Sequence, residues 1–322
     1  MKAVQMSEYG GPEVLRYTDV GEPVAGPGEA LVQLAASGVN YMDVYGRTGL
    51  YGQGPLPTIL GGEGAGTVLE VGPGVTAPAV GDVVAYTGAS QSYAQRVVVP
   101  AWRLIALPEG ISAEQAAAAM LQGMTAHYLA HSTYALGPDD TALIHAGAGG
   151  VGHLLIQMAK MRGATVITTV STEEKAGLAR GAGADHVVLY TREDFHEAVM
   201  SVTNGAGCQV AYDSVGATTY EGSLASLSLR GFLVLYGQSS GVVPPIAPLT
   251  LNAKSLFLTR PTLGNYTLTR DELEWRAGDV LGWIAQGRLS LRITERFPLR
   301  DAAEAHRRLE SRQTTGKLLL IP

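Results

Sequence analysis

The chain has 322 residues, of which 46% are hydrophobic and 16% are charged, and its formal net charge is −6. This length predicts two domains, and the composition predicts a large buried core and excludes extensive disorder. The acidic balance argues against a nucleic-acid partner, which requires a basic surface.

No apolar run approaches the roughly 18 residues of a membrane span, so we expect no membrane partner. Cys208 is the only cysteine, which excludes a disulfide within the chain and a Cys-rich zinc site. With no apolar leader at the N-terminus, these features favour a cytoplasmic location.

The first hundred residues alternate short apolar runs with Pro- and Gly-rich turns, which predicts a small β-barrel or sandwich. The predicted strands are Ala30–Ala36, Gly64–Val71, Asp82–Tyr86, Arg96–Pro100 and Trp102–Leu107. Ser112 and Gln115 then form a predicted capping box that begins an Ala-rich helix, and helical structure resumes as far as Tyr134.

From Thr141 onward, predicted strands and helices alternate, which indicates a doubly wound parallel sheet. The predicted strands are 141–146, 164–170, 186–190, 209–213, 231–236 and 255–260, and the helices are 150–162, 173–181, 193–203 and 218–228. A helix at 269–286, a strand at 292–298, a helix at 301–312 and a strand at Lys317–Ile321 follow. We expect the doubly wound domain to be inserted into the β-rich one.

A glycine turn separates the first predicted strand of this domain from its helix. Gly147, Gly149 and Gly152 fit the pattern G-x-G-x-x-G, in which glycines permit a tight turn, close approach to a pyrophosphate and close helix packing. The N–H groups of the following helix then hold the anion. The turn therefore predicts a Rossmann dinucleotide site, and the candidate contacts are Ala148, Gly149, Gly150 and Val151.

The residues after the second strand favour NADPH over NADH. NAD-binding units place an acid about 20 residues past the glycines, where it bonds the ribose 2′-hydroxyl. Here Ser171 and Thr172 stand at that place and Lys175 follows. A hydroxyl and an ammonium would hold a 2′-phosphate that a carboxylate would repel. Ser171 is also predicted to cap a helix with Glu174 at its third position, and the two roles are compatible.

These residues resemble the quinone oxidoreductases of the zeta-crystallin type, in the medium-chain dehydrogenase/reductase superfamily. The resemblance covers the whole chain. It rests on Asp139 to Lys160 around the glycine turn and on GGPEVL (10–15), GVNYMDVYGRTGLY (38–51), GGEGAG (61–66), YDSVG (212–216), YGQSSG (236–241), TRP (259–261) and the ending LESRQTTGKLLLIP.

The resemblance implies a GroES-like catalytic domain, residues 1–122 and 263–322, and a Rossmann NADPH-binding domain, residues 123–262. It also implies a zinc-free, NADPH-dependent enzyme that reduces a quinone and forms a homodimer. The zinc alcohol dehydrogenases of the superfamily carry a Cys near Asn40 and a His within the motif G-H-E, where this chain has Gly61-Gly62-Glu63. A quinone needs no Lewis acid, because its electrophilicity is intrinsic.

The resemblance implies that the segment from Asn40 to Tyr45 lines the nicotinamide and substrate cleft. Asn40, Asp43 and Tyr45 are candidate cofactor contacts, and Asn40, Tyr45 and Tyr51 are the candidate catalytic residues that position the quinone. The alternatives are a polar loop with local hydrogen bonds and, for Tyr51, ordinary loop packing.

Ligands of doubly wound sheets bind outside the carboxyl ends of the strands, and the remaining candidates follow strands. They are Tyr190, Ser214, Tyr236, Gly237, Gln238, Ser239 and Arg260. Tyr190 is also compatible with ordinary β-structure, and Arg260 with a surface position. His127 and His131 share a helix face without a third ligand, so we expect no metal site, and Cys208 is expected in the core.

The sequence thus predicts an NADPH:quinone oxidoreductase. Two alternatives remain open. One is an NADPH-dependent reductase of activated alkenes such as enones or alkenals. The other is a non-enzymatic NADPH-binding protein, crystallin-like or associated with RNA.

Overall fold

The computed structural model describes residues 1–51 and 54–322, and backbone contacts divide them into two units. Unit 1 comprises Met1–Met124 and Thr267–Pro322, and unit 2 comprises Thr125–Tyr266. Unit 2 is therefore inserted, along the chain, between two parts of unit 1. The exact domain limits given above, 122/123 and 262/263, stay a prediction.

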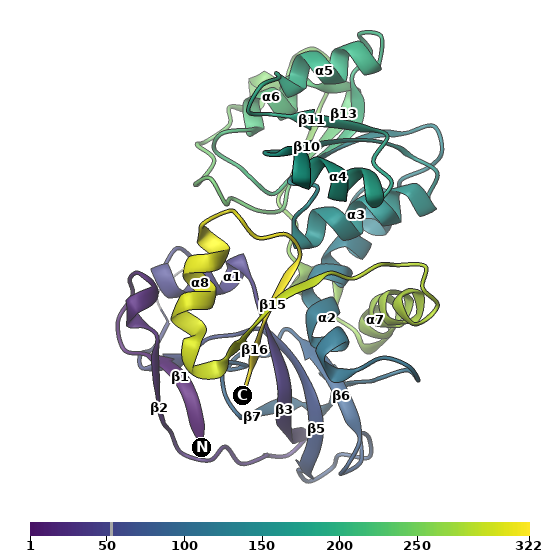
Figure 1. The fold of residues 1–322 in the computed structure, drawn as a ribbon. Helices are drawn as coiled ribbons and strands as arrows, with labels where there is room; N and C mark the ends of the chain where they lie inside the picture. Colours follow the sequence, from purple (N-terminus) through teal and green to yellow (C-terminus); the bar gives the residue numbers. More distant parts are fainter. Residues whose placement is uncertain (52–53) are drawn as a thin grey trace. The chain divides into compact units, whose positions relative to one another are not determined.

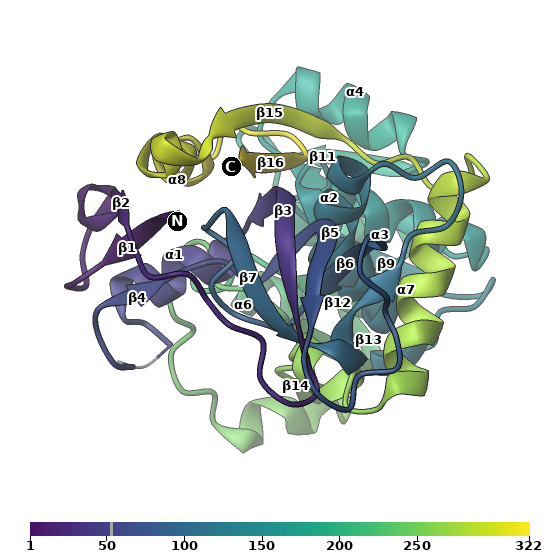
Figure 2. The ribbon, with the colours of Figure 1, turned by 90° about the horizontal axis from the view of Figure 1, so that it is seen from below.

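Unit 1 is built on a seven-stranded sheet with the order β15-β16-β3-β5-β6-β8, in which β7 also pairs with β3 (Figure 2). Its strands are β3 (Glu29–Val39), β5 (Glu63–Val71), β6 (Val83–Thr87), β7 (Arg96–Pro100), β8 (Ile105–Ala106), β15 (Ile293–Pro298) and β16 (Lys317–Ile321). The C-terminal strand β16 pairs antiparallel with β3, so residues 317–321 lie next to residues 29–39 in this sheet.

A three-stranded sheet with the order β2-β1-β4 lies in the same unit. Its strands are β1 (Lys2–Met6), β2 (Arg16–Asp19) and β4 (Thr58–Ile59). The helices of unit 1 are α1 (Tyr41–Thr48), α2 (Ala113–Tyr128), α7 (Arg270–Ala285) and α8 (Ala302–Glu310). The last turn of α2 belongs to unit 2. Short 3-10 helices span Pro12–Val14, Ala101–Arg103 and Leu299–Asp301. An apolar cluster of residues from β1, β16 and α8 forms one core, and the inner residues of β3, β6 and β7 form another.

Unit 2 is a six-stranded parallel sheet with helices on both faces (Figure 1). The strands are β9 (Thr141–His145), β10 (Thr165–Val170), β11 (His186–Leu189), β12 (Cys208–Asp213), β13 (Leu227–Leu235) and β14 (Phe257–Thr259). Their order, β11-β10-β9-β12-β13-β14, is that of a dinucleotide-binding sheet, and it reverses between β9 and β12. The predicted doubly wound sheet is confirmed.

The helices of unit 2 follow the strands in alternation. They are α3 (Gly150–Met161), α4 (Glu173–Gly181), α5 (Phe195–Val202) and α6 (Tyr220–Ala225), with a π-helical turn at Leu129–Thr133 and 3-10 helices at Pro248–Lys254 and Leu263–Tyr266. Helices α3 and α4 pack on β9, β10 and β11, whereas α6 packs on β12 and β13 beside α5. Each helix thereby buries one apolar stripe against the sheet.

Two predicted elements of unit 1 differ in the structure. The predicted strand Trp102–Leu107 begins as a 3-10 helix, and only Ile105–Ala106 pair as β8. The Ala-rich helix α2 runs without a break to Tyr128, because four consecutive alanines at 116–119 favour helix and are fully buried. The predicted capping box is confirmed, since Ser112 and Gln115 exchange hydrogen bonds of 2.9 and 3.2 Å.

Within residues 1–51 and 54–322, no helix combines the length and the apolar character needed to cross a membrane.

Candidate functional site

The glycine turn joins β9 to α3 in the order that the motif predicts. Helix α3 begins directly after Gly149. A Cβ on Gly147 would collide with the hydroxyl of Thr168, and a Cβ on Gly152 would collide with the carbonyl oxygen of Ala146. Both positions therefore require glycine for packing. The first N–H groups of α3 have no acceptor within the helix, and this arrangement binds an anion.

The four predicted contact residues lie at this turn. Ala148 is buried, with 3% of its surface exposed, whereas Gly149, Gly150 and Val151 are partly exposed. The turn follows β9, the strand next to the point where the order of the sheet reverses. Ligands of doubly wound sheets bind at this reversal.

A buried polar network lies behind the turn. His145 Nδ1 is 2.9 Å from Thr169 Oγ1, and His145 Nε2 is 2.9 Å from Ser223 Oγ. Ser223 Oγ donates to Asp213 Oδ2 at 2.9 Å, so Nε2 of the imidazole is the donor to Ser223. Burial lowers the pKa of His145, which keeps the ring neutral. These hydrogen bonds connect the carboxyl ends of β9, β10 and β12. Asp213 also fixes the loop after β12, because its Oδ1 accepts the N–H groups of Val215 and Gly216.

The residues after β10 differ from the predicted capping box. The N-cap of α4 is Thr172, whose Oγ1 accepts the N–H of Lys175 at 3.3 Å. The prediction that Ser171 caps the helix, with Glu174 at its third position, is wrong, because α4 begins at Glu173 and the third helical residue is Lys175. The hydroxyl of Ser171 is therefore not used as the cap of α4.

Tyr190 lies beside Ser171 at the same edge of the sheet. The N–H of Tyr190 donates to the carbonyl of Val170 at 3.2 Å, and Thr191 Oγ1 donates to the carbonyl of Ser171 at 3.3 Å. Tyr190 is half-exposed. Partial burial lowers the pKa of Lys175, and Glu174 opposes that effect. A nearby phosphate would favour the charged ammonium.

The loops after β12 and β13 are hydrogen-bonded to each other. The N–H of Tyr236 donates to the carbonyl of Asp213 at 2.9 Å, and that of Ser239 donates to the carbonyl of Ser214 at 3.2 Å. Gly237 is packed so closely that a Cβ would lie 2.6 Å from the carbonyl oxygen of Ser214. The predicted residues Ser214, Tyr236, Gly237, Gln238 and Ser239 thus form one wall at the carboxyl edge of the sheet.

Arg260 follows β14 and joins the same edge. Its Nη1 donates to the carbonyl of Leu235 at 2.8 Å, at the end of β13. The side chain of Arg260 is exposed, so both its role at the cofactor and its alternative as a surface arginine stay predictions.

The remaining predicted residues lie on or beside helix α1 of unit 1, and the segment from Tyr41 to Thr48 is helical and is not a loop. Asn40 precedes the helix and Asp43 is its third residue. Asp43 Oδ2 accepts the N–H of Asn40 at 2.8 Å. Tyr45 is 7% exposed and Tyr51 is 51% exposed, and their ring centroids lie 4.9 Å apart. The structure thus brings the two tyrosines together.

A buried ion pair holds the side chain of Asn40. Lys317 of β16 and Glu63 of β5 form a salt bridge with no exposed surface on either side chain. Lys317 Nζ donates to Asn40 Oδ1 at 2.7 Å, and Asn40 Nδ2 donates to Glu63 Oε1 at 2.7 Å. Glu63 Oε2 accepts the N–H of Leu121 in α2 at 2.7 Å. Sequence reasoning missed Lys317, because it lies 277 residues from Asn40.

A second buried chain of hydrogen bonds ends at Asp43. Tyr93 Oη donates to Asp43 Oδ2 at 3.0 Å, and His306 Nε2 lies 3.0 Å from Tyr93 Oη. Arg47 Nη1 lies 3.0 Å from His306 Nδ1. Since arginine only donates, Nδ1 accepts and Nε2 carries the proton. The chain continues to Glu310, which accepts two hydrogen bonds of 2.9 Å from Arg47.

The charge states in this chain follow from burial. Burial raises the pKa of Asp43 to about 7, although the N–H of Asn40, Lys317 and Tyr93 oppose the shift. Burial and the Arg47 guanidinium lower the pKa of His306 to about 3. Sequence reasoning missed Tyr93 and His306 because they lie on distant segments, and no local pattern marks them.

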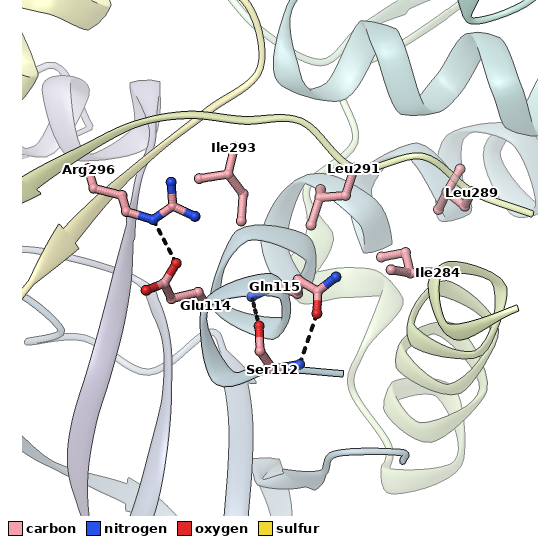
Figure 3. Close-up of a pocket in the computed structure, with 8 residues that line it drawn as sticks. All are labelled: Ser112, Glu114, Gln115, Ile284, Leu289, Leu291, Ile293 and Arg296. Carbon is pink, nitrogen blue, oxygen red and sulfur yellow. Dashed lines mark hydrogen bonds and ion pairs between the residues drawn. The ribbon is translucent and has the colours of Figure 1, made fainter. Parts of the chain in front are cut away.

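A cavity of about 510 Å³ lies elsewhere in unit 1 (Figure 3). It is lined by apolar side chains from α7 and the segment that leads into β15, and by the N-terminus of α2, where Arg296 pairs with Glu114 at 2.7 Å. No predicted site residue lines it. It lies between packed elements and is separate from the candidate site.

Comparison with known proteins identifies both halves of the chain. Residues 26–109 match the alcohol dehydrogenase GroES-like domain, and residues 150–281 match the zinc-binding dehydrogenase family. A quinone oxidoreductase from Pseudomonas aeruginosa is 46% identical over 100% of this chain and 99% of its own length. A 2-haloacrylate reductase from Burkholderia is 40% identical over 99% of this chain and 98% of its own.

The crystal structure of Escherichia coli quinone oxidoreductase complexed with NADPH superposes with a TM-score of 0.98, at 42% identity and with complete coverage of both chains. A GroES-like domain joined to a Rossmann domain defines the medium-chain dehydrogenase/reductase class. Within that class, the chain belongs to the quinone oxidoreductase family. The predicted family and fold class are confirmed.

The donor set of unit 1 does not fit the zinc that the broader family name implies. Asn40 and Gly62 stand where zinc alcohol dehydrogenases have Cys and His, and both carboxylate oxygens of Glu63 already accept hydrogen bonds. The Lys317 ammonium also lies against that carboxylate and would repel a metal cation. Among the residues that the structure describes, no three His, Cys, Asp or Glu side chains form a potential ligand group.

Proposed function

We propose that the protein is an NADPH:quinone oxidoreductase that works without zinc. The observation that carries the proposal is the glycine turn at the reversal point of the sheet, followed by Ser171, Lys175 and Tyr190 at one edge. Relatives of the same length are named quinone oxidoreductases, and one of them was crystallised with NADPH.

The residues of unit 2 fit NADPH. The N-terminus of α3, with Ala148, Gly149, Gly150 and Val151, would hold the pyrophosphate. Ser171, Lys175 and Tyr190 would hold the 2′-phosphate by two hydroxyl groups and one ammonium. Glu173 lies nearby, and Arg192 pairs with it at 3.5 Å, which reduces the repulsion of a phosphate.

The other predicted residues would orient the reactants. Ser214, Tyr236, Gly237, Gln238, Ser239 and Arg260 would form the wall on the nicotinamide side. Bound NADPH would supply reducing equivalents from C4 of its nicotinamide. Asn40, Asp43 and Tyr45 would contact the cofactor, and the paired rings of Tyr45 and Tyr51 offer an apolar face with hydroxyl groups for a quinone. Their contribution is orientation and exclusion of water.

A second candidate function is the reduction of activated alkenes. It is favoured by the 40% identity to a 2-haloacrylate reductase over nearly the whole chain. An electron-poor carbon–carbon double bond is, like a quinone, an acceptor that needs no metal. The two functions therefore use the same cofactor site and differ in the substrate.

We further propose a cytoplasmic homodimer. Strand β14 is an edge strand of the parallel sheet, and Phe257 and Leu258 on it are 51% and 38% exposed. An open, apolar strand edge readily pairs with another strand, and a second copy of the chain offers the same edge about a two-fold axis.

The first experiment measures NADPH oxidation with a panel of quinones and a panel of enones, with a chelator present. We expect chelator-resistant quinone turnover and a dissociation constant at least about tenfold lower for NADPH than for NADH. Lys175→Ala should reduce this preference with little effect on NADH. Equal affinity for both cofactors would overturn the NADPH assignment.

If the protein reduced enones and did not reduce quinones, the proposed substrate class would change from a quinone to an activated alkene. NADPH binding with no turnover of either panel would favour the non-enzymatic alternative.

A further inference from the structure

The ion pair between Glu63 and Lys317 is the most deeply buried charged group in unit 1 that the proposed function does not use. Both side chains have 0% exposure. Removing charges from water is costly, and a buried pair is retained only when its geometry satisfies both partners. Here the pair also contacts Asn40, a candidate catalytic residue.

The pair fixes the orientation of the Asn40 carboxamide. Lysine only donates and an ionised carboxylate only accepts, so the oxygen of Asn40 must face Lys317 and its nitrogen must face Glu63. A rotation of the amide by half a turn would place two acceptors together and two donors together. The position of the Asn40 side chain is thus set by charge and not by packing alone.

The backbone around the pair is shaped to admit it. A Cβ on Gly38 would collide with the carboxylate of Glu63 and lie 2.6 Å from Cε of Lys317. Gly38 and Asn40 flank Val39, the last residue of β3, and Val39 pairs with Leu318 on β16. The pairing of β16 with β3 therefore also brings Lys317 to Asn40.

We propose that Lys317 is a positioning residue for the reaction. Its ammonium, which forms a salt bridge with Glu63, fixes the orientation of the carboxamide of Asn40 at the N-cap of α1. The inference rests on the proposed function, since Asn40 contacts the nicotinamide or substrate only if that function is correct. Lys317 and Glu63 act through Asn40 and do not themselves contact the reactants.

The test compares Lys317→Met with Lys317→Arg and with the double variant Glu63→Met/Lys317→Met. Removal of Lys317 alone leaves a buried carboxylate unpaired and could prevent folding. Replacement of both charged side chains by apolar ones of similar volume leaves no unpaired charge, so the double variant is expected to fold. Arg296→Met is the matched control, because it removes a cation from the neighbouring strand β15 at a surface ion pair.

In the double variant we expect kcat for the quinone to fall between about tenfold and about a hundredfold, the cost of a misplaced reacting group. Binding of adenosine 2′,5′-bisphosphate, which tests unit 2, should not change. Lys317→Arg should recover most of kcat, and Arg296→Met should match the wild type. A folded double variant with wild-type kcat would overturn the proposal.

Hydrogen–deuterium exchange of the free protein provides a readout that does not depend on turnover. The segment 38–48 should exchange faster in the double variant than in Arg296→Met, while the segment 141–161 should not change. Equal exchange of segment 38–48 in the two variants would also overturn the proposal. If the wild type itself lacked quinone turnover, the proposed function would fail, and the exchange result would still decide whether Lys317 holds Asn40.

Discussion

Asp43 and His306 have opposite effects on the pH dependence of folding. The pKa of Asp43 is raised from 3.8 to about 7, so the folded chain retains a proton that the unfolded chain has lost. This group alone makes the free energy of unfolding fall as pH rises from about 4 to about 7. The pKa of His306 is lowered from 6.5 to about 3. This group alone makes the free energy rise as pH rises from about 3 to about 6.5.

Because the two effects cancel between about pH 4.5 and about pH 6, we expect single variants to reveal them. The free energy of unfolding of Asp43→Asn should rise with pH relative to the wild type, by up to about 1.4 kcal/mol per pH unit. That of His306→Gln should fall with pH by a similar amount. Urea titrations at several pH values measure both slopes, and slopes parallel to the wild type would contradict the assigned protonation states.

The sequence motif identified Asn40 and Asp43 as candidate site residues. It did not identify the side chains that form hydrogen bonds with them. Lys317, Tyr93 and His306 contact these residues from distant strands and helices. No short-range spacing marks such contacts, because they are created by strand pairing and helix packing. The individual roles of the predicted site residues stay predictions that the experiments above test.

At the scale of elements, the glycine turn gives a direct test. We expect Gly147→Ala to lower the free energy of unfolding by about 1–3 kcal/mol, because its Cβ would collide with Thr168. It should also weaken NADPH binding by displacing the N-terminus of α3. Thermal or urea unfolding and NADPH titration measure the two effects.

Gly177→Ala is the matched control for this variant. Gly177 lies inside α4 and has nothing within 4 Å of an added Cβ, so alanine should stabilise the helix by up to about 1 kcal/mol. A stability loss equal to that of Gly147→Ala would mean that close packing at the turn is not the cause.

Most elements of unit 2 follow from local sequence, since apolar strands, glycine turns and amphipathic helices alternate there without ambiguity. The errors lie at element ends. Thr172 and not Ser171 caps α4, because both residues are good N-caps and only the path of the chain after β10 distinguishes them. The predicted strand Trp102–Leu107 is shorter in the structure, because its first two residues belong to a 3-10 helix and only Ile105–Ala106 pair as β8.

At the scale of the whole molecule, the open edge of β14 predicts how copies associate. Leu258→Lys should place a charge on this edge and shift a dimer toward monomer, since charged residues on edge strands oppose pairing. Sedimentation velocity over a range of concentrations measures the shift. Val24→Lys is the control, because Val24 is an exposed apolar residue of unit 1. A dimer unaffected by Leu258→Lys would exclude this edge as the interface.

The sequence by itself determined the parallel sheet, the glycine turn, the hydroxyl residues Ser171 and Thr172 directly after β10 and the family. Each of these features is carried by residues close together in the chain. The tertiary structure alone decided which residues surround Asn40 and Asp43. Pairing of β16 with β3 brings Lys317 to Asn40, and packing of α8 brings His306 to Tyr93. In such contacts, charged groups from distant segments are removed from water together. The free-energy cost of that burial is offset only when the partners meet in the folded unit.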